Sequence, residues 1–310
     1  MTMCRRWLPR VAAGAVVLIN AVLANGQGHY ARGQNVVPVF EGWERNADES
    51  INMVFGYMNR NYEQEMDIPV GPDNMFSPGP ADQGQTEHFY ARRQEFVFKV
   101  KLPKDWGQKD LVWTLRSAGK IEKAYGSLLP TWELGNLVYQ ENRKGAGDVT
   151  YPEEPNQPPA IEMVGSARRM VAAGEPLSLT VEVTDDGHPV PRVRPIRVAR
   201  PPDASGIDGP RIENPITQAV VKLDPGVRLG VTWVWYRGGP GTVTFAPMRV
   251  PVARAPSPGT PAKAEPVSGK ATTTVTFGQP GTYQLRGYAD DGILTAPVDV
   301  IVTVQGKPQP

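Results

Sequence analysis

The stretch "GQPGTYQLRGYADDGILTAPVDVIVTV", Gly278 to Val304, decides the fold of the second half of this chain. Apolar or small residues alternate with polar ones on both sides of its centre, which is typical of strands with one buried face. The positions on the apolar side are Tyr283, Leu285, Gly287, Ala289, Val298, Val300, Val302 and Val304. Between the two runs lies Asp290-Asp291-Gly292, whose carboxylates can accept backbone N–H bonds and whose glycine can take a positive φ. The stretch therefore predicts a hairpin.

Tyr283 follows Pro280-Gly281, where an immunoglobulin-like sandwich has its tyrosine corner at the start of strand F. A corner requires partner strands earlier in the chain. One run, Leu177 to Thr184, alternates and ends in a second Asp-Asp-Gly at 185–187. Another, "VTWVWY" at 231–236, places Trp233 where strand C of such sandwiches has a core tryptophan. We therefore expect Trp233 and Tyr283 to be structural residues of one core.

The motifs "AGEPLSLTVEVTDDG", "VTWVWYRGGPGTVTF" and "ATTTVTFGQPGTYQLRGYADDG" occur in this order between residues 156 and 305. Together they resemble the PKD and related immunoglobulin-like repeats of bacterial surface and secreted proteins. The resemblance implies a β-sandwich over 160–305 that spaces, presents or sometimes binds, without chemistry of its own. Two Pro-rich segments, 188–230 and 246–270, are predicted to be long loop insertions, and 151–159 a Pro-rich linker.

The first 26 residues have the parts of a signal peptide: Arg5, Arg6 and Arg10, then the apolar run "VAAGAVVLINAVLA", then small residues. We therefore predict an extracytoplasmic protein, periplasmic or secreted, with no membrane span after cleavage. Cys4 is the only cysteine and lies inside this peptide, so the mature chain is predicted to lack disulfides, thiol catalysis and zinc–thiolate sites. Loss of the three arginines changes the formal net charge from +1 to −2.

The first insertion has a basic run among its prolines, formed by Arg192, Arg194, Arg197 and Arg200. Such a run is either a solvated loop or a strip that docks on an anionic polymer or on the acidic first domain. Nucleic acid is not an expected partner of an exported protein. The apolar run Ile216 to Leu223 lies near the end of this insertion and could add an edge strand or dock on the first domain.

Residues 36–150 read as a second β-rich unit, because short strand-like runs such as "INMVFGYM", "EFVFKVKL" and "LVWTLRS" are separated by Gly, Pro, Asn and Asp. Phe96, Phe98 and Val100 are expected inside, with Lys99 and Lys101 outside. One short helix is expected in "PTWELGNLVYQEN". The stretch from residue 40 to residue 107 resembles an uncharacterised domain of exported bacterial proteins, and no activity comes with that resemblance. The predicted fold class is all-β, with two β-sandwich domains.

Aromatic, amide and basic residues are concentrated in this first domain. Rings stack on the apolar faces of sugars while polar groups meet the hydroxyls, so the cluster is a candidate glycan-binding surface; equally, such aromatics are common in sandwich cores. The candidate binding residues are Trp43, Tyr57, Asn59, Arg60, Asn61, Tyr62, His88, Tyr90 and Arg92.

Catalytic motifs for hydrolases, metalloproteases or nucleotide binding are absent from the sequence, and only three histidines occur. His88 is the one plausible catalytic histidine. The carboxylates Asp185, Asp186, Asp290 and Asp291 are weak candidates for Ca²⁺, although turn chemistry alone explains both Asp-Asp-Gly sequences. No other metal and no cofactor is expected.

The sequence therefore predicts a non-enzymatic exported module with a structural, spacing or interaction role at the bacterial cell surface or in the periplasm. A carbohydrate-binding protein is the alternative, and a glycan-active enzyme is a third possibility. The expected partner is a glycan or another exported protein.

Overall fold

The computed structural model describes residues 30–142, 156–190, 219–224, 226–254 and 263–306. The predicted signal peptide, most of the linker and the four arginines of the basic run in the first insertion lie outside these residues. Within them almost all regular structure is β-strand, with one α-helix and one 3₁₀ turn, so the all-β prediction is confirmed. No helix among the described residues is long and apolar enough to span a membrane.

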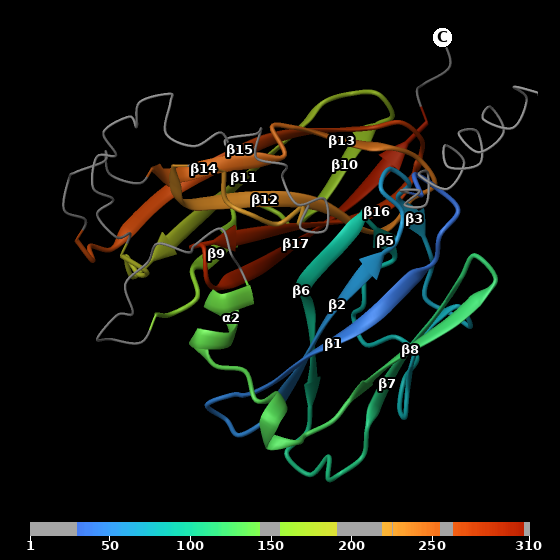
Figure 1. Ribbon diagram of the computed structural model, residues 1–310. Helices are drawn as coiled ribbons and strands as arrows, with labels where there is room; N and C mark the ends of the chain where they lie inside the picture. The colour runs from blue at the N-terminus through green and yellow to red at the C-terminus, as the bar shows by residue number, and fades with distance from the viewer. Residues whose placement is uncertain (1–29, 143–155, 191–218, 225, 255–262, 307–310) are drawn as a thin grey trace, which may run out of the picture.

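The first domain is a sandwich of two three-stranded antiparallel sheets with a short two-stranded ribbon at its end (Figure 1). One sheet contains β1 (Val36–Arg45), β2 (Ile51–Asn59) and β6 (Arg92–Leu102). The other contains β4 (Asn74–Ser77), β7 (Leu111–Ser117) and β8 (Lys120–Gly126). The ribbon pairs β3 (Met66–Asp67) with β5 (His88–Phe89).

Aromatic side chains from both sheets fill this core. Phe55 is completely buried, and its ring centroid lies 5.1 to 6.0 Å from those of Phe40, Phe76, Phe98 and Trp113. Alternation along the strands brings these rings to the inner faces, while Lys99 and Lys101 point outward as expected.

The second domain is an immunoglobulin-like sandwich. One sheet has the order β13-β15-β11-β9 and the other β10-β17-β16-β12-β14, with β10 parallel to β17. Apart from β10 and β14, the strands occupy the places of the A, B, E, D and the G, F, C strands of that fold. The bounds are β9 (Ala160–Met163), β10 (Arg168–Ala172), β11 (Leu177–Asp185), β12 (Val227–Gly238), β13 (Val243–Ala246), β14 (Arg249–Arg254), β15 (Val267–Phe277), β16 (Gly281–Asp290) and β17 (Thr295–Gln305).

Trp233 and Tyr283 lie in this core and are both fully buried. The Tyr283 hydroxyl donates to Gln279 O at 2.8 Å and accepts from Gly241 N at 3.2 Å, which is the bonding of a tyrosine corner. Gly287 faces Trp233 across the β12–β16 pair, and a Cβ there would stand 3.2 Å from the indole ring. The absence of a side chain at Gly287 therefore makes room for the tryptophan.

The structure corrects the predicted limits of the two insertions. Strand β12 begins at Val227 instead of 231, and β15 begins at Val267 instead of 271. The segment 246–270, predicted as a loop, contains β14, which pairs with β12. Proline misled the prediction here, because Pro251 lies on an edge strand, where a missing N–H costs no ladder bond.

The described end of the first insertion docks on the first domain instead of forming an edge strand. Val220 N donates to the Gln94 side chain of β6 at 2.8 Å, and Arg249 Nη2 donates to Val220 O at 2.9 Å. Of the two outcomes expected for this apolar run, the structure shows docking on the first domain.

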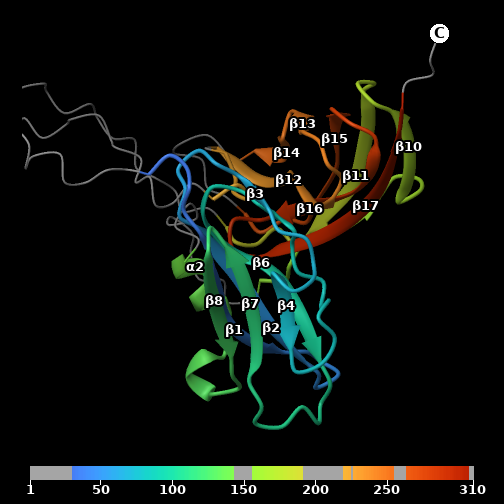
Figure 2. The ribbon, with the colours of Figure 1, turned by 90° about the vertical axis from the view of Figure 1, so that its right-hand side faces the viewer.

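The second domain lies above the first in both Figure 1 and Figure 2. The predicted helix in the connection is a 3₁₀ turn, η1 (Pro130–Trp132), followed by α2 (Asn136–Asn142). Tyr139 of α2 packs with Phe96 and Ile293, and therefore fills the space between the two domains.

Candidate functional site

The two asparagine side chains of the predicted binding cluster form hydrogen bonds within the first domain. Asn59 and Asn61 are completely buried. Asn59 Nδ2 donates to Gln64 O at 2.8 Å and to Phe89 O at 3.1 Å, while Asn61 Oδ1 accepts from Gln34 N at 2.7 Å. These bonds tie the turn after β2 to the start of the domain and to β5, so the amides are directed into the fold.

Arg60, Tyr62 and Arg92 form a small group beside this turn. Arg92 is buried, its Nη1 donates to Arg60 O at 3.1 Å, and its guanidinium carbon lies 3.8 Å from the Tyr62 ring centroid. This cation–π contact covers one face of the Tyr62 ring. Arg60 is the exposed member of the group.

Two more predicted binding aromatics are core residues. Trp43 is 4% exposed and donates its indole N–H to Leu129 O at 2.9 Å. Tyr57 is 2% exposed, and its hydroxyl accepts from Tyr90 N at 2.9 Å. Neither ring presents a face to solvent.

His88 and Tyr90 lie where the two domains meet. His88 Nδ1 is 2.7 Å from Asp67 Oδ1, and Nε2 is 3.1 Å from Glu65 Oε2. The imidazole stacks on Trp235 of β12, with ring centroids 4.2 Å apart and planes at 19°. The Tyr90 hydroxyl accepts from Trp235 N at 2.8 Å. The first domain thus contacts β12 through His88 of β5 and through Tyr90, the residue after β5.

Tyr236, the next residue of β12, is inserted into the first domain. It is 1% exposed and belongs to the aromatic core of that domain, although its strand belongs to the other. Its hydroxyl donates to Gly84 O, and its carbonyl accepts from Glu87 N at 2.9 Å. The Arg286 guanidinium lies 3.7 Å from the centre of its ring on the second-domain side.

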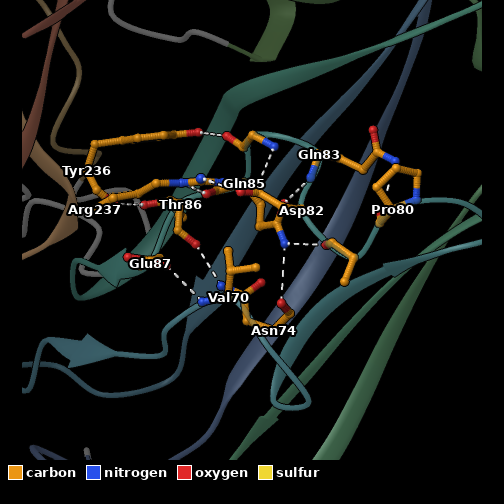
Figure 3. Close-up of polar contacts among 12 residues, drawn as sticks. Val70, Asn74, Pro80, Asp82, Gln83, Gln85, Thr86, Glu87, Tyr236 and Arg237 are labelled. Carbon is orange, nitrogen blue, oxygen red and sulfur yellow. Dashed lines mark hydrogen bonds and ion pairs between the residues drawn. The ribbon is translucent and has the colours of Figure 1, made fainter.

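Arg237 completes this contact (Figure 3). Its two Nη atoms donate to the two Asp82 carboxylate oxygens at 3.1 and 2.9 Å, and its Nε donates to Gln85 O. Gly238 N donates to Glu87 Oε2 at 2.9 Å. Residues 82–87 therefore cover the end of β12 with charged and backbone bonds, which adds orientation to the burial of Tyr236.

A bulge in β6 makes another contact with the second domain. The β2–β6 register jumps between Phe55/Phe98 and Tyr57/Gln94, so three residues of β6 loop out opposite Gly56. Within the bulge, Val97 O accepts from the Tyr288 hydroxyl at 2.6 Å.

A buried ion pair lies under this bulge. Both Glu41 oxygens accept from Arg93 Nη2 at 2.8 Å, and Oε1 also accepts from Phe96 N at 3.4 Å. Burial raises the pKa of Glu41, an effect that Arg93 opposes. The pair therefore supports the bulge from within the first domain.

The Asp-Asp-Gly carboxylates close their own turns. Asp185 and Asp186 accept from Gly187 N at 2.9 Å and His188 N at 2.8 Å. Asp290 accepts from Gly292 N at 2.7 Å, and Asp291 accepts from Ile293 N and Leu294 N, each at 2.7 Å. Among the described residues, no three acidic, histidine or cysteine side chains are grouped to hold a metal ion. Calcium binding stays a prediction without a grouped ligand set.

The arrangement around His88 suits positioning more than proton transfer to a substrate, because each ring nitrogen already has a carboxylate partner. A small, shallow surface pocket lies elsewhere, between the described end of the first insertion and strands β12 and β14. It is lined by Lys222, Leu223, Asp224, Val227, Gly230, Val231, Thr232, Arg249, Val250 and Pro251.

Sequence reasoning missed the residues that join the domains: Glu65, Asp67, Asp82, Trp235, Tyr236, Arg237 and Tyr288. A signal for β12 was present. From Leu229 to Tyr236 every residue is buried, and the sequence "VTWVWY" is apolar on both faces. A strand without alternation is typically covered on both sides. The outward Val234 and Tyr236 therefore indicated a partner on the outer face.

No family model and no curated protein matches the chain. Solved structures that match at low similarity include fibronectin(III)-like modules of CbhA from Clostridium thermocellum, with 11% identity, TM-score 0.21, and coverage of 88% of this chain and 95% of that one. Domains 4 and 5 of the S-layer protein SbsC match with 10% identity, TM-score 0.22, and coverage of 87% and 98%. A protein of unknown function from Porphyromonas gingivalis W83 matches with 8% identity, TM-score 0.22, and coverage of 87% and 98%. The immunoglobulin-like assignment rests on the sheet order of the second domain, and the PKD family is not shown.

Proposed function

We propose that this protein is an exported, non-catalytic module whose two sandwiches form one fixed body, which spaces or supports a partner at the bacterial cell surface or in the periplasm. The observation that carries the proposal is Tyr236, a second-domain residue buried in the core of the first domain. A flexible tandem would not place a core side chain across its junction.

The polar contacts support the same proposal. Trp235 N, Glu87 N and Gly238 N all donate across the junction, at 2.8 or 2.9 Å. Changing the angle between the domains would leave the N–H groups of buried Trp235 and half-buried Glu87 without partners, at about 1 to 3 kcal/mol for each. The junction therefore holds one geometry.

The proposed partner is another exported protein. Of the residues predicted to bind a glycan, the aromatic rings are largely occupied within the fold, and Arg60 is the exposed one. Stacking on a sugar requires an open ring face. A glycan array with the chain from Gln27 onward tests the alternative, and binding lost in Arg60→Ala would favour it.

The fixed geometry can be measured by electron paramagnetic resonance, because the chain from Gln27 onward contains no cysteine. Spin labels on Lys101→Cys in β6 and Ser178→Cys in β11 report on one domain each, and both positions are exposed. At pH 5.5 we expect one narrow distance distribution. Tyr236→Ala should broaden it, whereas Tyr125→Ala, which removes a tyrosine that is 57% exposed, should not.

A broad distribution in the unmodified protein at pH 5.5 would contradict the fixed body. Export is tested separately by fractionating cells that express the full chain. Recovery from the cytoplasm alone, with the first 26 residues retained, would contradict the proposed location.

A further inference from the structure

His88 is the titratable group at the centre of the junction, and a rigid spacer does not need its charge. Asp67 Oδ1 and Glu65 Oε2 lie 2.7 and 3.1 Å from its two ring nitrogens. Both partners are carboxylates, which only accept, so both nitrogens must donate. The neutral imidazole has one N–H and the imidazolium has two. The geometry therefore requires protonated His88.

The groups around the ring agree with a positive charge. Trp235 of β12 stacks on it at 4.2 Å, and an indole face attracts a cation. Tyr90, edge-on at 4.6 Å, stays neutral because burial raises its pKa. Nearby charges are already engaged: Glu87 accepts from Gly238 N, and Arg237 pairs with Asp82. The carboxylates that face His88 come only from β3 and the turn before it, within the described residues.

Burial by itself would lower the pKa of His88, but the hydrogen bonds and charges of Asp67 and Glu65 outweigh it and raise the pKa above its ordinary value. A raised pKa in the folded state adds stability that is complete below the unfolded value of 6.5 and is lost as the pH rises through the folded value. The effect of His88 therefore disappears as the pH rises through a folded-state pKa that lies above 6.5.

We propose that protonated His88 latches the two domains together, and that their junction loosens when His88 loses its proton. After that loss, one carboxylate faces a nitrogen lone pair at about hydrogen-bond distance, and Trp235 loses a cation from its ring face. Both effects act on β12, where the first domain grips the second. This inference rests on the proposed fixed body, because it describes how pH would control the junction that holds that body together.

The spin-labelled pair at Lys101→Cys and Ser178→Cys tests the latch with the chain from Gln27 onward. At pH 5.5 we expect the single narrow distance distribution, and at pH 8.5 a broad or second one. In His88→Gln the distribution should be broad at both values. In the matched variant His188→Gln, which changes a histidine outside the junction, the response to pH should be that of the parent protein.

A second measurement does not require the His88→Gln variant to fold. The ring protons of His88, followed by NMR, should titrate above pH 6.5, and Asp67→Asn should lower that midpoint by about one unit. The midpoint of the distance change should move with it.

The outcomes separate the two proposals. A narrow distribution at both pH values in the parent protein, or an NMR midpoint below 6.5, overturns the latch and leaves the fixed body intact. A broad distribution at pH 5.5 overturns the fixed body.

Discussion

Trp113 and Trp233 are both completely buried, one in each domain, but only one indole N–H has a partner. Trp113 Nε1 donates to Asn74 Oδ1 at 2.9 Å, whereas Trp233 Nε1 has no hydrogen-bond partner among the described residues. An unpaired buried donor already costs free energy, and removing a paired one leaves its acceptor unsatisfied. The two tryptophans should therefore differ in their response to the same change.

We expect Trp113→Phe to lower the free energy of unfolding by about 1 to 3 kcal/mol more than Trp233→Phe, because only the former leaves Asn74 Oδ1 without a donor. Both changes remove a similar ring volume, so each controls for the cavity made by the other. Trp233→Ala should cost about 3 to 5 kcal/mol, as for other large core aromatics. Urea unfolding curves measure all three. Equal losses in the two phenylalanine variants would show that the Trp113–Asn74 bond contributes little.

Residue identity predicted Trp233 and Tyr283 because their sequence neighbourhoods have one structural meaning in a sandwich. It did not separate core from surface in the first domain. Tyr57, Asn59 and His88 are residues that either a sugar site or a polar core can contain, and only the three-dimensional contacts show that they bond inward.

At the scale of elements, period two predicted the strands, and the departures from it were not predictable. Phe96 was expected on the inner face of β6 but lies in the bulge, with a φ of 51°, and packs on Tyr139 of α2. Alternation continues through "EFVFKV" in the sequence, so nothing local marks the three extra residues. The cause lies in β2, where Gly56 admits the Glu41 carboxylate.

Gly56→Ala tests that cause. A Cβ at this position would meet Glu41 Oε1 and the Gln94 carbonyl at less than contact distance, so the β6 bulge or the Glu41–Arg93 pair must shift. We expect a loss of about 1 to 3 kcal/mol in the free energy of unfolding, as for other overpacked sites. The control is Gly306→Ala, where a Cβ meets nothing within 4 Å. Similar stability of the two variants would mean that the bulge does not depend on Gly56.

At the scale of the whole molecule, the sequence indicated two sandwiches but not their relation. The contacts that join them connect residues about 150 positions apart, such as Thr86 with Tyr236 and Gly84 with Tyr236. The sequence around either residue contains no pattern that predicts its contact with the other. The apolar outer face of β12 indicated a covering element, and the fold alone shows that the element is the first domain.

Buried acidic groups and His88 give the whole molecule one direction of response to pH. Burial raises the pKa of Asp185 to about 6 and that of Asp291 to about 7, from ordinary values of 3.8. Each carboxyl is therefore protonated more readily in the folded chain than in the unfolded one. Stability from such groups is present in mild acid and is lost as the pH rises through the folded value, the same sign as for His88.

We expect the free energy of unfolding to fall by an amount on the order of 3 kcal/mol between pH 5 and pH 8. Asp291→Asn should remove much of this slope without a large loss of stability. Asn156 donates to Asp291 Oδ2 at 3.0 Å while its own Oδ1 has no partner among the described residues. A rotated Asn156 side chain can therefore accept from the amide group that this substitution introduces. Urea unfolding at several pH values measures the slope, and stability that stays constant from pH 5 to pH 8 would show that these carboxyls are already ionised in the folded protein at pH 5.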